Sequence, residues 1–327
     1  MSPLTPPTAD RVAAPTEERN PATTAIDAVP TVEVLRLLNA EDARVPAAVG
    51  ALLPALAAVV DETVGRLRAG GRVHYFGAGT SGRVAVMDAA ELIPTFGLPP
   101  GVVVAHIAGG PGALTVPVEG AEDSAAGGSA DAAEVGAGDV VVGLTASGRA
   151  PYVAGALQSA RATGAYTVLV SANPDAALAS AVDVHLGADT GPEAIAGSTR
   201  LKAATAQKLI LNGLSTAAMI ALGHTYSNLM VDLAPTNGKL RGRVLTILTE
   251  ATGLPEEACA TALAAADGEL KTALVCLLGA VAPGEARRAL AAASGQVRAA
   301  LAASARTCAP RGGRRHSRET GAEDQGR

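Results

Sequence analysis

Five short runs rich in valine recur along the middle of the chain and constrain its fold more than any other feature. They read RVHYF, VVVAHIAG, DVVVGLT, YTVLVSA and VDVHLG, and helical or glycine-rich segments separate them. Continuously apolar strands that alternate with helices are typical of a parallel sheet covered on both faces. We therefore predict an α/β fold with a doubly wound parallel sheet in residues 45–253.

Helical patterns flank this predicted domain on both sides. Residues 1–44 predict an N-terminal arm, extended to about residue 30, and a first helix that begins in TVEVLRLLNAEDARV. Residues 254–305 predict a small C-terminal module of four short helices, punctuated by glycine and proline, in which we see no internal repeat. Residues 306–327, with the basic run RGGRRHSR, predict a disordered tail.

Composition argues against several functional classes. The net charge of the 327 residues is −5, so no global basic field recruits nucleic acid. The three cysteines are odd in number and lack metal-ligand spacing, as is typical of a reducing cytoplasm. The N-terminus lacks the pattern of a signal peptide, and Pro54 interrupts the most apolar stretch, residues 46–60. We expect a cytoplasmic protein without a membrane or nucleic-acid partner.

The segment GAGTSG, residues 77–82, follows the first predicted strand and opens a helix. Its glycines fit the dinucleotide pattern G-x-G-x-x-G, and free N–H groups at a helix start favour an anion. A dinucleotide site also needs an acidic residue about 20 positions on, whereas the next strand ends in IAGG. Because Thr80 and Ser81 add hydroxyl groups to the turn, we favour a single phosphate over NAD.

A second turn of the same kind follows the strand DVVVGLT. It reads TASGRA, with Ser147 and Gly148 before the next helix. Serine and threonine here are also consistent with simple helix caps. Two hydroxyl-rich turns after two strands of one parallel sheet instead favour a shared ligand site at the carboxyl ends of the strands.

The segment PEAIAGSTRLKAATAQK places hydroxyl groups and cations at the start of a further helix. Ser198, Thr199 and Lys202 are therefore candidates for contact with a phosphate or a carboxylate. Helix capping and solvated surface cations are the alternative for this segment. His74 and His106 lie in strand patterns, and we interpret them as core or edge residues.

Several longer motifs occur in order along the chain and carry a family resemblance. They are TEERNPATTAID, GAGTSGRVAVMDAAELIPTFG, VEGAEDS, GLTASGRAPYV, GSTRLKAATAQKLILN and NLMVDLAPTNGKL. Together they resemble the N-acetylmuramic acid 6-phosphate etherase family, whose sugar isomerase (SIS) domain implies a flavodoxin-like, three-layer fold that binds phosphosugars. The resemblance covers nearly the whole chain up to Cys308.

The resemblance also implies a reaction and its residues. The family removes the D-lactyl ether from C3 of the sugar by elimination followed by addition of water, without a metal or organic cofactor. Glu91 matches the proton donor to the lactyl oxygen, Glu122 matches the base at C2, and Glu119 is a candidate to orient the sugar. The expected substrate-binding residues are Gly79, Thr80, Ser81, Glu119, Ser147, Gly148, Ser198, Thr199 and Lys202.

The position of Glu91 predicts a shared active site. If residues 82–91 form one helix, Glu91 lies about 14 Å from the phosphate turn, farther than a hexose phosphate reaches to C3. Either the helix is broken or Glu91 serves a second subunit, and we expect a homodimer. This sequence has Leu92, Ile93 and Pro94 after Glu91, where the family commonly has Cys-Pro-Pro.

Two other functions are compatible with the phosphosugar turns. An aldose–ketose phosphosugar isomerase also removes a C2 proton but has no use for an acid at C3. A non-catalytic phosphosugar sensor, like the regulatory protein of glucokinase, needs the turns but not two carboxyl groups beside an anionic ligand. Retention of Glu91 and Glu122 favours the etherase.

Overall fold

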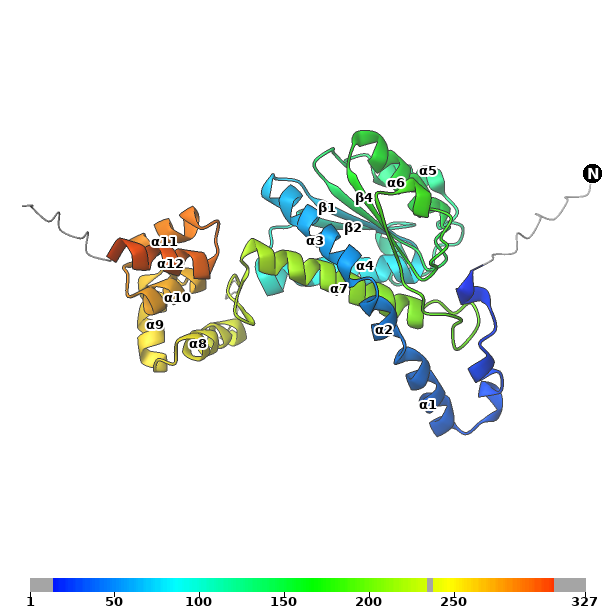
Figure 1. The fold of residues 1–327 in the computed structure, drawn as a ribbon, viewed down its shortest axis with the longest axis horizontal. Coiled ribbons are helices and arrows are strands. Elements are labelled where there is room, and N and C mark those ends of the chain that lie inside the picture. Colours follow the sequence, from blue (N-terminus) through cyan, green and yellow to red (C-terminus); the bar gives the residue numbers. More distant parts are fainter. Residues whose placement is uncertain (1–13, 234–237, 309–327) are drawn as a thin grey trace, which may run out of the picture. The chain divides into compact units, whose positions relative to one another are not determined.

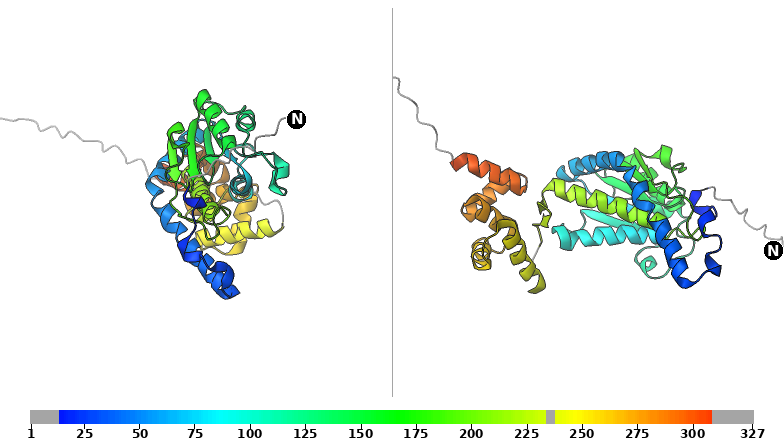
Figure 2. Two further views of the ribbon diagram at one scale, coloured as in Figure 1. Left: turned by 90° about the vertical axis from the view of Figure 1, so that its right-hand side faces the viewer. Right: turned by 60° about the horizontal axis from the view of Figure 1, so that its bottom comes forward.

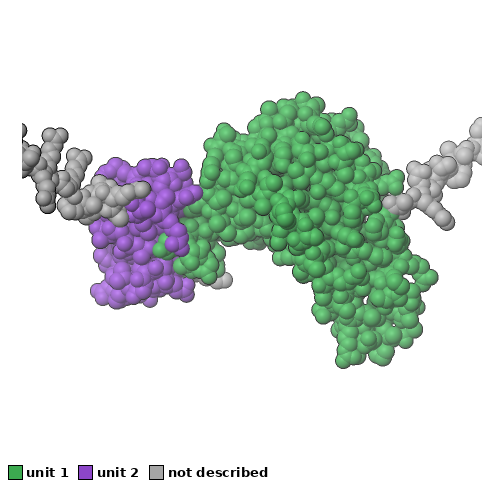
Figure 3. Space-filling view, in the orientation of Figure 1, with its two compact units in different colours: residues 1–244 green, residues 245–327 purple. Residues whose placement is uncertain are grey.

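The computed structural model describes residues 14–233 and 238–308. The chain divides into two compact units, residues 1–244 and residues 245–327, which are coloured separately in Figure 3. The basic run of the tail and the first part of the arm lie outside the described residues. The two units are described in turn.

The first unit is built on the predicted parallel sheet. All five expected strands are present, and they pair in the order β2-β1-β3-β4-β5. Their bounds are β1 Val73–Gly77, β2 Val103–Ile107, β3 Val140–Leu144, β4 Tyr166–Ser171 and β5 Val184–Gly187. This is the strand order of flavodoxin-like folds, which confirms the predicted fold class.

Helices cover both faces of the sheet (Figures 1 and 2). On one face lie α3 (Leu53–Arg68), α4 (Gly79–Phe96) and α7 (Lys202–Leu222), and on the other α5 (Ala125–Asp131) and α6 (Pro151–Thr163). Successive strand residues point to opposite faces. Thus Tyr75 packs in the core under α3, α4 and α7, and Phe76 in the core under α5 and α6.

The described part of the N-terminal arm is not the extended segment that the sequence predicts. It forms the 3₁₀ turns η1 (Pro15–Glu17), η2 (Pro21–Thr23) and η3 (Ile26–Ala28), followed by α1 (Thr31–Asp42) and α2 (Val45–Gly50). Proline at the first position fixes the backbone of η1 and η2. Hydrogen bonds to residues distant in sequence also anchor the arm.

The remaining elements of the first unit are short connections. They are η4 (Pro111–Leu114), η5 (Ala179–Ala181) and the hairpin strands β6 (Thr225–Tyr226) and β7 (Leu229–Met230). Helix α8 (Gly238–Thr252) continues into the second unit. Among the described residues no single helix is both long and apolar enough to cross a membrane, although the bent pair Thr31–Gly50 and Leu53–Arg68 meets that test by length and composition.

The second unit contains the four short helices that the sequence predicts. They are α9 (Glu256–Ala265), α10 (Leu270–Gly279), α11 (Pro283–Ala292) and α12 (Val297–Cys308). The turn after α9 has left-handed backbone at Asp267 and Gly268, and the turn after α11 repeats it at Ser294 and Gly295. The two helix pairs thus share a turn conformation, a similarity that was not recognised from the sequence.

Candidate active site

The turn between β1 and α4 depends on three glycines with different roles. A Cβ on Gly77 would lie 2.7 Å from the nitrogen of Gly82, and a Cβ on Gly82 would lie 2.5 Å from Cγ1 of Ile107. These two glycines therefore let the strand end and the helix start pack in contact. Gly79 has a left-handed φ of 53° and faces open space. It turns the backbone so that Thr80 and Ser81 begin α4 beside that space.

The turn between β3 and α6 has a related construction. Gly148 has a φ of 76°, and a Cβ there would lie 2.2 Å from Cβ of Ala176. Asn173, which follows β4, donates a hydrogen bond from Nδ2 to the carbonyl oxygen of Ser147 at 3.1 Å. The neighbouring strand thereby holds the backbone of the turn in place.

The two turns meet at the point where the strand order reverses. Strand β1 lies between β2 and β3, so the chain leaves β1 and β3 in opposite directions across the sheet. Ligands of such folds bind at this switch point, beyond the carboxyl ends of the strands. A cavity of about 250 Å³ lies there. It is lined by Glu17, Ala78, Gly79, Thr80, Ser81, Glu122, Leu144, Thr145, Ala146, Ser147, Ala150, Gly197 and Thr199.

Glu122 brings a carboxyl group to this cavity from the segment before α5. Glu119 and Glu122 both lie in a series of turns. The carbonyl oxygen of Glu122 accepts a hydrogen bond from the N–H of Tyr152 at the start of α6, at 2.9 Å. This bond ties the turn to the same helix that follows the second hydroxyl-rich loop.

The surroundings of Glu122 favour its protonated form more than water does. The residue is exposed, but the protein around its carboxyl group removes part of the solvent. This burial raises the pKa of Glu122, and the neighbouring carboxylate of Asp123 raises it further. A carboxylate with a raised pKa is a stronger base than an ordinary one, provided that it is still ionised at the working pH.

A second cavity of about 290 Å³ shares Ala78, Gly79 and Glu122 with the first. Glu119 lines this second cavity and not the first. Arg83 lines it as well, and its guanidinium donates to the carbonyl oxygens of Ala113 and Leu114 in η4. Glu122 therefore lines both of these adjoining cavities, whereas Glu119 lines only the second.

The N-terminal arm forms part of the wall of the first cavity. This role of the arm was not predicted from the sequence. Glu17 lines the cavity together with Gly197 and Thr199 from the segment before α7. The N–H of Gly197 donates to the carbonyl oxygen of Thr16 at 2.9 Å, so the arm and this segment lie side by side. The available signal was the arm motif TEERNPATTAID, which contains Glu17.

Comparisons with known proteins place the chain in a family. A protein of Thermobifida fusca (strain YX) named N-acetylmuramic acid 6-phosphate etherase is 65% identical over 267 residues, which cover 82% of this chain and 88% of that protein. A protein of Rubrobacter xylanophilus with the same name is 53% identical over 277 residues, covering 84% and 92%. The chain belongs to the N-acetylmuramic acid 6-phosphate etherase family.

Two further likenesses concern the domain that carries the cavity. The sequence profile of the glucokinase regulatory protein N-terminal SIS domain matches residues 55–161 of this etherase-family chain. Among solved structures, a phosphoheptose isomerase from Francisella tularensis is 19% identical with a TM-score of 0.46, over 59% of this chain and 100% of that one.

Glu91 lies outside the cavity that holds Glu122. Helix α4 is continuous from Gly79 to Phe96, with Pro94 inside it. Residues 82–91 therefore form one unbroken helix, as the distance estimate for Glu91 assumed. Glu91 comes ten positions after Ser81, which corresponds to about 15 Å along the helix. Glu91 is exposed, not enclosed by apolar residues of its own chain. Leu92 is buried in the core beneath α4, and Ile93 is exposed.

The other predicted ligand residues divide into three groups. Gly79, Thr80, Ser81, Ser147 and Thr199 line the first cavity, whereas Gly148 and Ser198 lie next to lining residues without lining it themselves. Lys202 is fully buried, and its ammonium forms an ion pair with Glu41 of α1. The structure therefore does not bring Lys202 to the cavity.

Glu193 has a structural position at the start of α7. Its carboxylate accepts hydrogen bonds from the N–H groups of Lys202 and Ala203, both at 3.0 Å. The cap fixes the end of the segment that carries Thr199 to the cavity. Within residues 14–233 and 238–308, no group of three His, Cys, Asp or Glu side chains is placed to hold a metal ion.

Proposed function

We propose that this protein cleaves the D-lactyl ether of N-acetylmuramic acid 6-phosphate, giving N-acetylglucosamine 6-phosphate and D-lactate in the catabolism of cell-wall amino sugars. One observation carries the proposal: in this etherase-family chain, Glu122 and both hydroxyl-rich turns line the same cavity. An odd set of cysteines, with Cys259 and Cys276 as free thiols, supports a reducing cytoplasm as the site of the reaction.

The two turns are suited to the phosphate group. The N–H groups at the start of α4 and the hydroxyl groups of Thr80, Ser81 and Ser147 all border the cavity. Such groups donate hydrogen bonds to phosphate oxygens, and the positive end of the helix dipole favours their negative charge. With the phosphate held there, the sugar carbons extend into the space next to Glu122.

Elimination avoids direct displacement of an alkoxide, which is a poor leaving group. In the open-chain sugar, the C1 aldehyde acidifies the proton on C2. Glu122 removes this proton, an acid protonates the lactyl oxygen as its bond to C3 breaks, and water then adds at C3 of the unsaturated aldehyde. The raised pKa of Glu122 suits the first step because it brings the base closer to the strength that proton abstraction requires.

We further propose that Glu91 of a second subunit supplies the acid. Helix α4 cannot readily unwind to carry Glu91 to its own cavity, since Asp88 one turn earlier is locked in place. Its carboxylate accepts hydrogen bonds from Tyr75 of β1 and from Asn212 and Ser215 of α7. A homodimer with the α4 helix of each subunit near the cavity of the other would supply the missing acid.

The reaction is tested by NMR of the protein with N-acetylmuramic acid 6-phosphate in deuterated water. We expect D-lactate together with N-acetylglucosamine 6-phosphate that carries deuterium at C2. Because general base catalysis contributes about 10²- to 10⁴-fold, Glu122→Gln should lower the rate by that factor. Binding of the substrate without lactate release or exchange at C2 would contradict the proposed function.

Shared sites are tested by mixing two inactive variants. In a dimer of one Glu91→Gln subunit and one Glu122→Gln subunit, sharing leaves one site with both carboxyl groups intact. We expect about half of the wild-type activity per verified mixed dimer, whereas each parent homodimer stays inactive. If each subunit uses its own Glu91, both sites of the mixed dimer lack one group and no activity returns.

A further inference from the structure

Glu17 is a second carboxylate in the cavity, and the reaction steps above give it no role. Among the residues that line this cavity, Glu17 and Glu122 are the two with titratable side chains. No hydrogen bond or ion pair to another described residue engages the Glu17 carboxylate. A carboxylate at this cavity repels the negative charge of a bound phosphosugar. Its presence there therefore suggests a chemical role toward the ligand.

The arm around Glu17 is anchored on both sides. Thr16 is fully buried and its carbonyl oxygen accepts from the N–H of Gly197. Farther on, Asn20 donates from Nδ2 to the carbonyl oxygen of Pro192 at 3.1 Å, and Thr23 donates from its hydroxyl to that of Ala194 at 2.8 Å. These bonds hold the backbone of Glu17 against the wall of the cavity and leave its side chain free.

The side chain of Glu17 also lies against the opposite segment. A Cβ on Gly197 would come within 3.1 Å of Oε2 of Glu17, and Gly197 has a left-handed φ of 75°. A glycine at this position therefore makes room for the carboxylate. The Glu17 carboxylate therefore has space beside the cavity, and no hydrogen bond to a described residue engages its oxygens.

The proposed reaction requires a step that Glu122 does not perform. A hexosamine phosphate with a free C1 exists mainly as a closed pyranose ring, in which C1 is a hemiacetal and the C2 proton is not acidic. Ring opening must precede proton abstraction. It requires a group that takes the proton from the C1 hydroxyl and a group that gives a proton to the ring oxygen.

We propose that Glu17 catalyses ring opening of the bound phosphosugar. Its carboxylate takes the proton from the C1 hydroxyl, and the electron pair of that O–H bond forms the aldehyde C=O. The bond between C1 and the ring oxygen breaks with its electron pair on the ring oxygen, which then receives the proton from Glu17. No proton is gained or lost overall, and the carboxylate is restored. The proposal rests on the etherase function proposed above.

Charge repulsion and the bonding of C1 to C2 support separate roles for Glu17 and Glu122. The negative phosphate repels a carboxylate, so Glu17 faces the sugar end of the ligand rather than the turns that hold the phosphate. C1 and C2 are bonded neighbours, and one cavity of about 250 Å³ holds both carboxylates. Glu17 at C1 and Glu122 at C2 would therefore act in sequence on adjacent atoms.

The test compares Glu17→Gln with wild type on substrate carrying hydrogen or deuterium at C2. We expect lactate release by E17Q to fall by about 10²-fold, within the range for general acid–base groups. Because ring opening then limits the rate, the isotope effect on kcat/KM should fall toward one. Glu18→Gln is the matched control: it removes the neighbouring exposed arm carboxylate, which does not line the cavity, and should preserve both rate and isotope effect.

The opposite results overturn the proposal. They are an E17Q rate equal to that of E18Q, or a lower rate whose isotope effect equals or exceeds the wild-type value. Calorimetric titration with N-acetylglucosamine 6-phosphate confirms that the E17Q cavity is intact. Failure of the wild-type protein to release lactate would refute the etherase function itself, whereas an unaffected E17Q would refute only the role of Glu17.

Discussion

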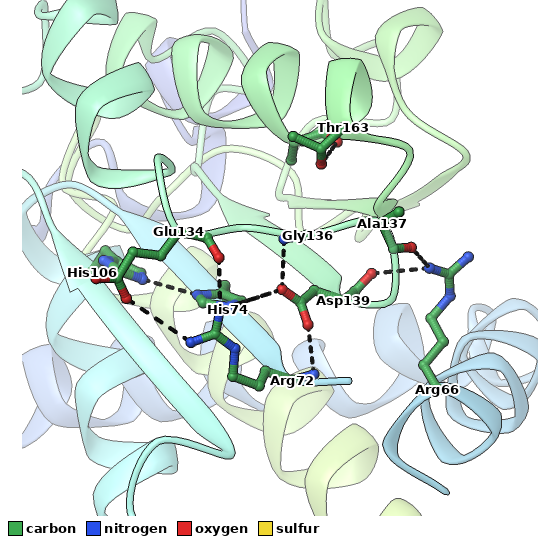
Figure 4. A network of polar contacts seen from close by, with 10 residues as sticks. Arg66, Arg72, His74, His106, Glu134, Gly136, Ala137, Asp139 and Thr163 are labelled. Atoms are coloured by element: carbon green, nitrogen blue, oxygen red, sulfur yellow. Dashed lines mark hydrogen bonds and ion pairs between the residues drawn. The ribbon is translucent and has the colours of Figure 1, made fainter. Parts of the chain in front are cut away.

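Buried His74 makes the stability of the first unit depend on pH in a way that can be measured. Its Nδ1 lies 3.2 Å from Nε2 of His106, and its Nε2 lies 3.5 Å from Oδ2 of Asp139 (Figure 4). Burial lowers the pKa of His74 to about 4, although the Asp139 carboxylate opposes this shift. In the unfolded chain the same imidazole titrates near 6.5.

The sign and size of the effect follow from this difference. Between pH 6.5 and pH 4 the unfolded chain binds a proton at this position that the folded chain does not. The free energy of unfolding therefore falls as the pH falls through this window, and the loss is complete below about pH 4. The His74 contribution to this loss between pH 7 and pH 5 is about 2 kcal/mol.

The assay is equilibrium unfolding in urea of wild type and His74→Gln at pH 7 and pH 5. Glutamine removes the titratable group, while His106, His185 and the carboxyl groups titrate in both proteins. We expect wild type to lose about 2 kcal/mol more than the variant between the two pH values, whatever their difference at pH 7. Equal losses would show that His74 is protonated in the folded chain as easily as in the unfolded one, and would refute the reasoning.

Two further substitutions test the packing that places the site. Gly82→Ala puts a Cβ 2.5 Å from Cγ1 of Ile107 and 2.7 Å from the carbonyl oxygen of Gly77, so we expect a loss of about 1–3 kcal/mol in urea unfolding; unchanged stability would mean that the β1–α4 turn adapts freely. Lys202→Met removes the buried cation of Glu41 and leaves only the exposed Arg44 at 3.6 Å, so it should cost about 3 kcal/mol, the low end for a broken buried pair. Adding Glu41→Gln should restore part of this loss, and simple additivity of the two losses would argue against a coupled pair.

The sequence predicted the sheet and both turns because these features are local. The valine-rich runs are long enough to identify all five strands, and each turn combines a glycine with a left-handed φ with hydroxyl groups at a helix start. That both turns reach one cavity follows from the strand order alone, since β1 and β3 are adjacent and parallel. The assignment of Thr80, Ser81 and Ser147 to one site needed only one assumption beyond the local patterns, that both strands belong to one parallel sheet.

Features that depend on distant contacts were not predictable in this way. From sequence alone, a cation at a helix start is interpreted as a ligand residue or a solvated charge. Nothing near Lys202 in the sequence indicates that Glu41 lies against it. The position of Glu17 was not predictable for the same reason. It depends on the hydrogen bonds that Asn20 and Thr23 of the arm form with residues more than 170 positions away. The similar turns in the second unit were visible as AAADGEL and AAASGQV, but alanine-rich helices match one another too readily to stand out.

The exposed side of α4 suggests how a second subunit would activate Glu91. Met87 lies one turn before Glu91 on the same side of α4 and is 45% exposed, so the carboxyl group has an exposed apolar neighbour there. Association along this side would bury Met87 and remove water from the neighbouring carboxyl group. Loss of water favours the neutral form of a carboxyl group, which is the form that donates a proton. The departure from Cys-Pro-Pro to Leu92, Ile93 and Pro94 leaves this side of the helix unchanged, since Leu92 fills the core of its own subunit and Ile93 lies around the helix from Glu91.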